Sequence, residues 1–184
     1  MSAISIITAK YKRAAENVAA NRLEHAVLMA MDAFALVADR VQNEGIGADG
    51  VKFPLYSKKM MPWWLINPSN YNSASKVEQF KKKARKGKND GSYDALRREY
   101  GLPTDKRTLT FDGDMWKSIH AVVEVHNEEY TIVVIRAKDT ENQNKINWNS
   151  NKLGISIIAF SDGDKELLSS LNQARVDKLL NQAN

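Results

Sequence analysis

The chain has 184 residues, of which 43% are hydrophobic, enough for one domain with a real core. It has no cysteine, which excludes a disulfide framework, a thiolate nucleophile and a Cys-ligated zinc site. No apolar run approaches the ~20 residues that cross a bilayer, and the first residues lack the pattern of a signal peptide. We therefore expect a soluble, unsecreted protein that makes no membrane contact.

The positive charge is local. The formal net charge is +5, and between Lys76 and Arg107 eleven Lys or Arg stand against five Asp or Glu, so the rest of the chain sums to −1. Such a patch is typical of contact with nucleic acid or with an acidic protein surface, and is also common as a solvated run with no partner.

Apolar residues at helical spacing predict a long N-terminal helix over residues 8–42, which the turn-forming run NEGIGADG ends. At 1.5 Å per residue this helix would be roughly 50 Å long, more than one small core needs. We expect part of it to pack on a neighbouring copy.

Residues 51–107 are predicted to form a proline-broken strap and then a long, irregular basic arm. Pro54, Pro62 and Pro68 prevent a continuous helix or a central strand. The strap either covers its own sheet or contacts another subunit, and Trp is enriched at such contacts. The candidate interface residues, including one from a later loop, are Phe53, Tyr56, Trp63, Trp64 and Trp148.

The arm carries a cluster of cations that could contact DNA phosphates or an acidic partner, or simply be solvated. The cluster consists of Lys81, Lys82, Lys83, Arg85, Lys86 and Lys88. We expect the arm to be mobile, with one short helix over residues 93–100, stopped by Gly101 and Pro103.

The sheet is predicted within residues 108–160. Period-two alternation predicts a hairpin that begins at Ile119 and returns from Tyr130 to Ala137, with a strand covered on both faces. A short strand over 108–111 and one helical turn over 115–118 precede it. A polar loop over 139–154 and a short strand over 155–160 follow.

A C-terminal helix is predicted over 162–182, because Ser161 and Asp164 form a capping-box pattern. The sequence thus predicts one α+β domain spanning residues 1–184. It has a long N-terminal helix, an antiparallel sheet built on a central hairpin, a C-terminal helix and the basic arm.

Residues for catalysis or metal binding are scarce. His120, Glu124 and His126 would share a strand face, but offsets of four and six residues span ~20 Å, too far for one ion. Asp112 and Asp114 flank a glycine and are expected to form a turn. No P-loop, zinc-protease or serine-hydrolase motif occurs. We therefore predict no catalytic residue, no metal site, no cofactor and no enzymatic activity.

The run FDGDMWKSI, followed by a hairpin, a polar loop, GISIIAFSD and a terminal helix, resembles the head-to-tail joining proteins of tailed bacteriophages. These are also called neck, tail-completion or virion morphogenesis proteins. The matching positions at the hairpin are Gly113, Met115, Ser118 and Ile119, and the runs VKFPLYSKK and LRREYGLPTDKRTLTF are similar as well. Many members have a Tyr-Ala pair and a Phe-Gly or Glu-x-Gly run in the later loop, where this chain has only Trp148 and Gly154.

This resemblance implies a structural virion protein at the portal vertex or neck, made in the host cytoplasm. It would form a homo-oligomeric ring, six-fold or twelve-fold, between the portal or connector ring and the tail proteins. The ring would line or surround the passage used in DNA ejection, where the basic arm would contact double-stranded DNA or an acidic face of a neighbouring ring.

Two other functions fit the residues less well. The first is a sequence-nonspecific nucleic-acid-binding protein that uses the cluster from Lys81 to Lys88 with Trp63, Trp64 and Tyr93 as stacking groups. The second is a metal-dependent enzyme that uses Asp112, Asp114 and His120.

Overall fold

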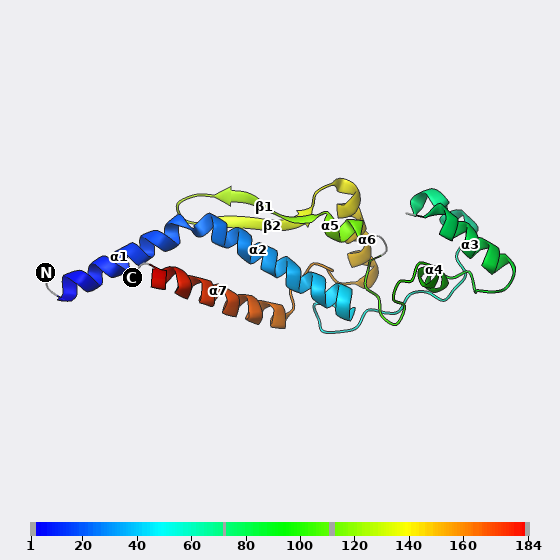
Figure 1. Cartoon of the computed structure of the whole chain (residues 1–184), viewed down its shortest axis with the longest axis horizontal. Helices are drawn as coiled ribbons and strands as arrows, with labels where there is room; N and C mark the ends of the chain where they lie inside the picture. Colours follow the sequence, from blue (N-terminus) through cyan, green and yellow to red (C-terminus); the bar gives the residue numbers. More distant parts are fainter. Residues whose placement is uncertain (1–2, 72, 111–112, 183–184) are drawn as a thin grey trace.

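The computed structural model describes residues 3–71, 73–110 and 113–182, and it confirms the α+β class. Figure 1 shows an elongated molecule in which a helical lobe projects from a longer body. The elements are α1 (Ala3–Ala20), α2 (Arg22–Asp39), α3 (Ala74–Arg85), α4 (Tyr93–Glu99), α5 (Asp114–Lys117), β1 (Ile119–His126), β2 (Thr131–Ala137), α6 (Thr140–Leu153) and α7 (Asp162–Gln182). We call residues 57–107, which contain α3 and α4, the small lobe, and we call the rest of the described chain the body.

The predicted N-terminal helix is present but interrupted at Asn21. The Asn21 side-chain amide donates to the backbone oxygen of Asn17 at 2.8 Å and to its side-chain oxygen at 3.0 Å. Asparagine side chains compete in this way with regular helix geometry, which explains the break. α2 then runs into a π-helical turn, Arg40–Glu44, which ends at Gly45 with a left-handed φ of 70°, so the predicted glycine-rich stop is confirmed.

The predicted hairpin is confirmed, with one irregularity that changes its faces. β1 and β2 pair antiparallel, Ile119 with Ala137 and His126 with Thr131, and a bulge falls between Val123 and Val125. Because the extra residue reverses the alternation, His126 lies on the face of Ile119, whereas His120, paired with Arg136, lies on the other. The predicted shared face of His120, Glu124 and His126 is therefore wrong.

The sheet is smaller than predicted. β2 pairs only with β1, and the described residues contain no further strand. Residues 155–160 form turns instead, although Ile157 is fully buried. Residues 108–110 are irregular because Leu109 adopts a φ of 54°, and Phe111 lies outside the described residues. β2 is thus covered on one face only, and Ile132 is exposed on the other.

The predicted polar loop over 139–154 is wrong, because this segment is α6. The Asp139 side chain caps the helix by accepting a hydrogen bond from the backbone nitrogen of Asn142 at 2.8 Å. This hydrogen bond also holds the pKa of Asp139 below its usual value. Ile146 is buried in the core with Leu153 packed near it, and Gly154 ends the helix with a φ of 70°.

The chain has two separate hydrophobic cores among its described residues. The body core joins α2, α5, β1, β2 and α6 through Val37, Val41, Phe53, Met115, Trp116, Ile119, Ala137, Ile146 and Ile157. The small-lobe core consists of Ile66, Val77, Phe80, Ala95 and Leu96. The predicted short helix over 93–100 is confirmed as α4. The preceding part of the arm, predicted to be irregular, is helical as well, because Val77 and Phe80 give α3 an apolar face that packs in this core.

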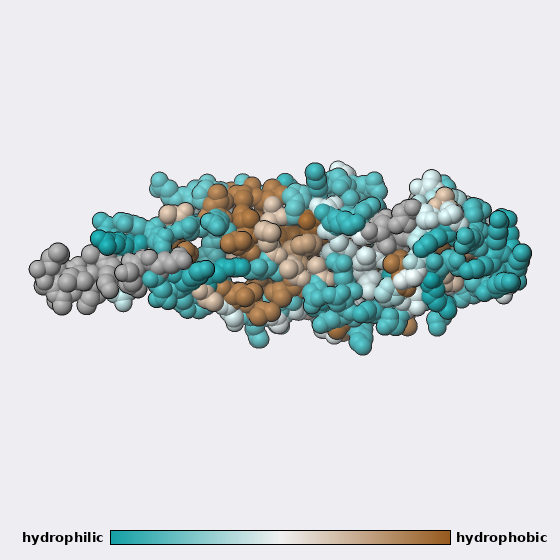
Figure 2. Space-filling view, in the orientation of Figure 1, coloured by the Kyte–Doolittle hydropathy of each residue, from teal (hydrophilic) through white to brown (hydrophobic). Residues whose placement is uncertain are grey.

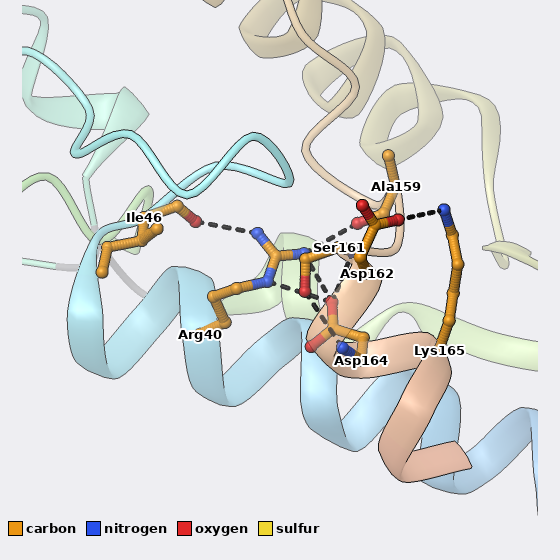
Figure 3. Close-up of polar contacts among 7 residues, drawn as sticks. All are labelled: Arg40, Ile46, Ala159, Ser161, Asp162, Asp164 and Lys165. Carbon is orange, nitrogen blue, oxygen red and sulfur yellow. Dashed lines mark hydrogen bonds and ion pairs between the residues drawn. The ribbon is translucent and has the colours of Figure 1, made fainter. Parts of the chain in front are cut away.

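A buried polar network joins the end of α2 to the start of α7 (Figure 3). Arg40 contacts the Asp164 carboxylate at 3.0 Å and donates to the backbone oxygens of Ile46 at 2.9 Å and Ala159 at 2.7 Å. Asp164 also accepts from the Ser161 backbone nitrogen at 2.8 Å, and the Ser161 hydroxyl accepts from the Asp164 nitrogen at 3.1 Å. The predicted capping box is confirmed, and Arg40 makes it part of the tertiary structure.

Candidate functional site

The cation cluster lies on α3 and the turn that follows it, and the structure separates its members. Lys81 pairs with Glu78 at 3.4 Å, and Lys83 pairs with Glu99 at 2.7 Å. Within the described part of the chain, no carboxylate pairs with the exposed side chains of Lys82, Arg85, Lys86 and Lys88. We call these four residues the basic surface. Positions 82, 85 and 86 share one face of a helix.

Two tryptophans lie next to this surface. The Arg85 guanidinium lies 5.8 Å from the centroid of the Trp63 ring, and Trp64 is 77% exposed. Both belong to a 3₁₀ turn, Trp63–Leu65, which is held to the small lobe because the next residue, Ile66, is fully buried in its core. The tryptophan part of the strap therefore forms one side of the small lobe, whereas Phe53, at the start of the strap, packs in the body core with Ile119 and Ala137 of the sheet.

The other candidate interface residues lie elsewhere. Phe53 is buried in the body core and Tyr56 is also buried, so neither side chain is available to another subunit. Trp148 lies on α6, 60% exposed, with the Lys152 ammonium 4.6 Å from its ring centroid. Trp63, Trp64 and Trp148 remain as exposed candidates.

The small lobe is attached to the body by Arg97, a residue that sequence reasoning missed. Its side chain is 1% exposed and donates to the backbone oxygens of Pro103 at 3.0 Å and Thr110 at 2.6 Å. The guanidinium also lies 4.1 Å from the Tyr56 ring centroid. The Tyr56 hydroxyl in turn accepts hydrogen bonds from the backbone nitrogens of Thr108 and Leu109, both at 3.1 Å. A buried arginine in α4 thus fixes the chain that returns to the sheet.

Alkaline pH should loosen this attachment. Burial raises the pKa of Tyr93 to about 12, although the hydrogen bond and charge of Arg97 oppose the rise. The phenol ionises near pH 10 in the unfolded chain, so its stabilising effect is complete below pH 10 and is lost between pH 10 and about 12. We expect a loss of ~2–3 kcal/mol in the free energy of unfolding across this range. Urea titrations at several pH values should show that the free energy of unfolding falls less between pH 10 and about 12 in Tyr93→Phe than in the unchanged chain. An equal fall in both proteins would contradict the assignment to Tyr93.

The body carries an open apolar groove, bounded by α2, β2 and the segment leading into α7. Its volume is about 560 Å³. The lining side chains are predominantly small or apolar: Ala26, Met29, Ala30, Ala33, Thr131, Val133, Val134, Ile135, Ile158, Phe160 and Leu168. Figure 2 shows hydrophobic surface over the middle of the body, where the hairpin, α2 and α7 lie, whereas the small lobe is mostly hydrophilic.

The candidate metal-binding residues are not brought together. The His120 ring contacts the backbone oxygen of Ser118 at 3.0 Å, and the His126 ring contacts the Thr131 hydroxyl at 2.8 Å. Asp114 lies in the first turn of α5 with Lys117 at 3.7 Å, and Asp112 lies outside the described residues. Nowhere in the described chain do three His, Asp or Glu side chains gather closely enough to hold a metal ion.

Among the described residues, the candidate functional features are thus two surfaces on two lobes, one basic and aromatic, the other apolar. Among the described helices, none combines the length and apolar character needed to cross a membrane. Comparisons with protein-family models, curated proteins and solved structures gave no match to this chain.

Proposed function

We propose that the chain is a structural subunit that assembles with copies of itself into a ring, and that this ring joins a phage head to its tail. The observation that supports assembly best is the excess of surface. The chain exposes 11685 Å², whereas a compact monomer of this mass exposes about 8,900 Å² by the usual scaling. Elongated subunits of this kind bury the excess against neighbours.

The chemistry of the exposed surface supports the same proposal. Large hydrophobic side chains are exposed on α2, the hairpin and α7, among them Met31 at 57%, Ile132 at 44% and Leu167 at 47%. Monomeric proteins rarely expose contiguous apolar patches of more than a few hundred Å². A two-stranded sheet with one open face is also marginally stable alone, so covering it would stabilise the fold. The link to a phage neck is supported by the resemblance of the runs VKFPLYSKK, LRREYGLPTDKRTLTF, FDGDMWKSI and GISIIAFSD to the head-to-tail joining proteins.

Native mass spectrometry and electron microscopy of the purified chain, alone and with a phage portal ring, test this function. We expect closed rings of one defined copy number. Replacing Ile132 and Leu167 by Asp should shift the population to monomers, whereas Asn144→Asp on exposed α6 should leave it unchanged. A chain that remains monomeric at every concentration, with and without the portal ring, would contradict the proposal.

A second candidate function, nonspecific binding of nucleic acid, is favoured by one observation. The basic surface has four exposed cations beside an exposed tryptophan turn, and cations with stacking groups bind nucleic acid without base recognition. This binding could operate within the ring or replace the ring as the main function.

Fluorescence anisotropy with a labelled duplex at several salt concentrations tests it. The test variant replaces Lys82, Lys86 and Lys88 together by Gln. We expect its plot of log binding constant against log salt concentration to be less steep, by roughly 0.9 for each phosphate that the variant no longer neutralises. The matched control replaces Lys12, Lys138 and Lys178, three exposed lysines of the body, which removes the same charge. An equal effect of the two variants would show that the net charge alone matters.

A further inference from the structure

We propose that the groove of the body receives the tryptophan turn of the small lobe of a second copy, with Trp64 and Leu65 as the inserted side chains. This inference rests on the proposed ring assembly and specifies which two surfaces meet in it. It is heterologous, because the groove and the turn are different surfaces of the same chain. A heterologous contact repeated from copy to copy gives a ring when the rotation closes.

The groove has the size and chemistry for such side chains. A cavity of roughly 150 Å³ already holds benzene, so about 560 Å³ leaves room for an indole ring and a leucine together. Its walls come from α2, β2 and the segment leading into α7. The Arg40 network fixes the end of α2 to the start of α7. The groove is therefore formed before a partner arrives.

The tryptophan turn is exposed and held in place. Trp64 is 77% exposed and Leu65 is 46% exposed. The turn is closed by hydrogen bonds from the Leu65 nitrogen to the Pro62 oxygen at 2.9 Å and from the Ile66 nitrogen to the Trp63 oxygen at 3.2 Å. Because the buried Ile66 anchors the turn, inserting Trp64 would cost little ordering of the backbone. Tryptophan is also the residue most enriched where alanine substitution weakens interfaces most.

The charges of the two lobes are complementary, which identifies a second copy as the occupant. Residues 51–107 contain fourteen Lys or Arg and five Asp or Glu, a net charge of +9. α2, the hairpin from β1 through β2, and α7 together contain five Lys or Arg and ten Asp or Glu, a net charge of −5. Opposite charges of this kind steer association and set its orientation.

A chain cannot satisfy this contact by itself in the arrangement observed. Figure 1 shows the small lobe at one end of the long axis, and the hairpin, α2 and α7 along the remainder. The lobe of one copy must therefore reach the body of the next copy.

The absence of cysteine allows a direct test by cross-linking. One full-length chain carries Leu65→Cys and an isotopic label, and a second, unlabelled full-length chain carries Leu168→Cys. The two chains are mixed, allowed to assemble and treated with a short bifunctional maleimide. We expect a cross-linked pair containing one chain of each kind. Leu65→Cys mixed with Asn144→Cys, on the exposed face of α6, should give none. Equal cross-linking in both mixtures would overturn the proposal.

Trp64→Ala supplies an independent measurement. We expect the dissociation constant for assembly to rise about 30-fold or more and its dependence on salt to remain, since the charged residues are unchanged. Val51→Ala, which shortens a 61% exposed hydrophobic side chain of the body, should leave assembly as it is. If Trp64→Ala still formed rings with unchanged affinity, and the Leu65→Cys and Leu168→Cys chains gave no cross-link, this contact would be overturned. The proposed function would still stand. A chain that never assembles would remove both.

Discussion

Replacing Arg40 by methionine is expected to lower the free energy of unfolding by about 3–5 kcal/mol. The side chains of Arg40 and Asp164 are only 10% and 9% exposed, so the change leaves a carboxylate buried without its cation. It also removes the donors to the backbone oxygens of Ile46 and Ala159, which no longer have that partner inside the protein. Urea unfolding followed by circular dichroism measures the loss.

Two further variants show whether the buried charge is the cause. Asp164→Asn added to Arg40→Met removes the unpaired charge but keeps a side-chain oxygen for the Ser161 nitrogen, so part of the stability should return. Lys165→Met breaks only the exposed pair with Asp162 and should leave the unfolding curve almost unchanged. An Arg40→Met curve that matches Lys165→Met would mean that the network does not hold α2 to α7.

The elements that the sequence predicted well are those specified by neighbouring residues. The hairpin follows from two β-prone runs, from Ile119 and to Ala137, joined by a short polar turn. The start of α7 follows from Ser161 and Asp164, which satisfy each other's backbone donors. The prolines of the strap prevented a long helix or strand as expected, since 3₁₀ turns are the only helical elements among residues 51–71. In these cases the deciding interaction spans only a few residues.

The errors occur where the deciding interaction was weak in the sequence or distant along it. α6 contains only two core-facing apolar residues, Ile146 and Leu153, in an Asn-rich segment, and its polar composition favoured a loop. The bulge at Glu124 changes the face of every later residue in β1, which alternation alone cannot indicate. The charge run from Lys81 to Lys88 concealed the two apolar residues, Val77 and Phe80, that make α3 part of a core.

The candidate surfaces were only half predictable for the same reason. The cations from Lys81 to Lys88 are close in sequence, so the basic surface could be inferred, whereas its contact with Trp63 joins residues 22 positions apart and could not. The groove combines residues from α2, β2 and α7, and α2 lies about a hundred positions or more from the other two, so no periodicity relates them. Phe53 and Tyr56 resembled interface residues by composition, but the fold uses both inside the chain.

Replacing Arg97 by methionine is expected to destabilise the small lobe by about 3 kcal/mol and the body much less. Arg97 is buried, and no carboxylate among the described residues forms an ion pair with it. Its guanidinium instead donates to oxygens of Pro103, Thr108 and Thr110 and lies over the Tyr56 ring. Methionine fills a similar space but leaves these oxygens without their donor. Hydrogen exchange by mass spectrometry should show faster exchange in α3 and α4, while α2 stays protected.

This pattern follows from the two cores. Arg97 contributes to the attachment between them, whereas the body core contains no residue of α3 or α4. Arg97→Lys keeps the charge but cannot reach several acceptors at once, so it should restore only part of the stability. Arg85→Met, an exposed arginine of α3 over the Trp63 ring, should cost at most about 1 kcal/mol. If Arg97→Met accelerated exchange equally in α2 and α3, the lobes would unfold as one unit, and the Tyr56 junction would be part of a single cooperative core.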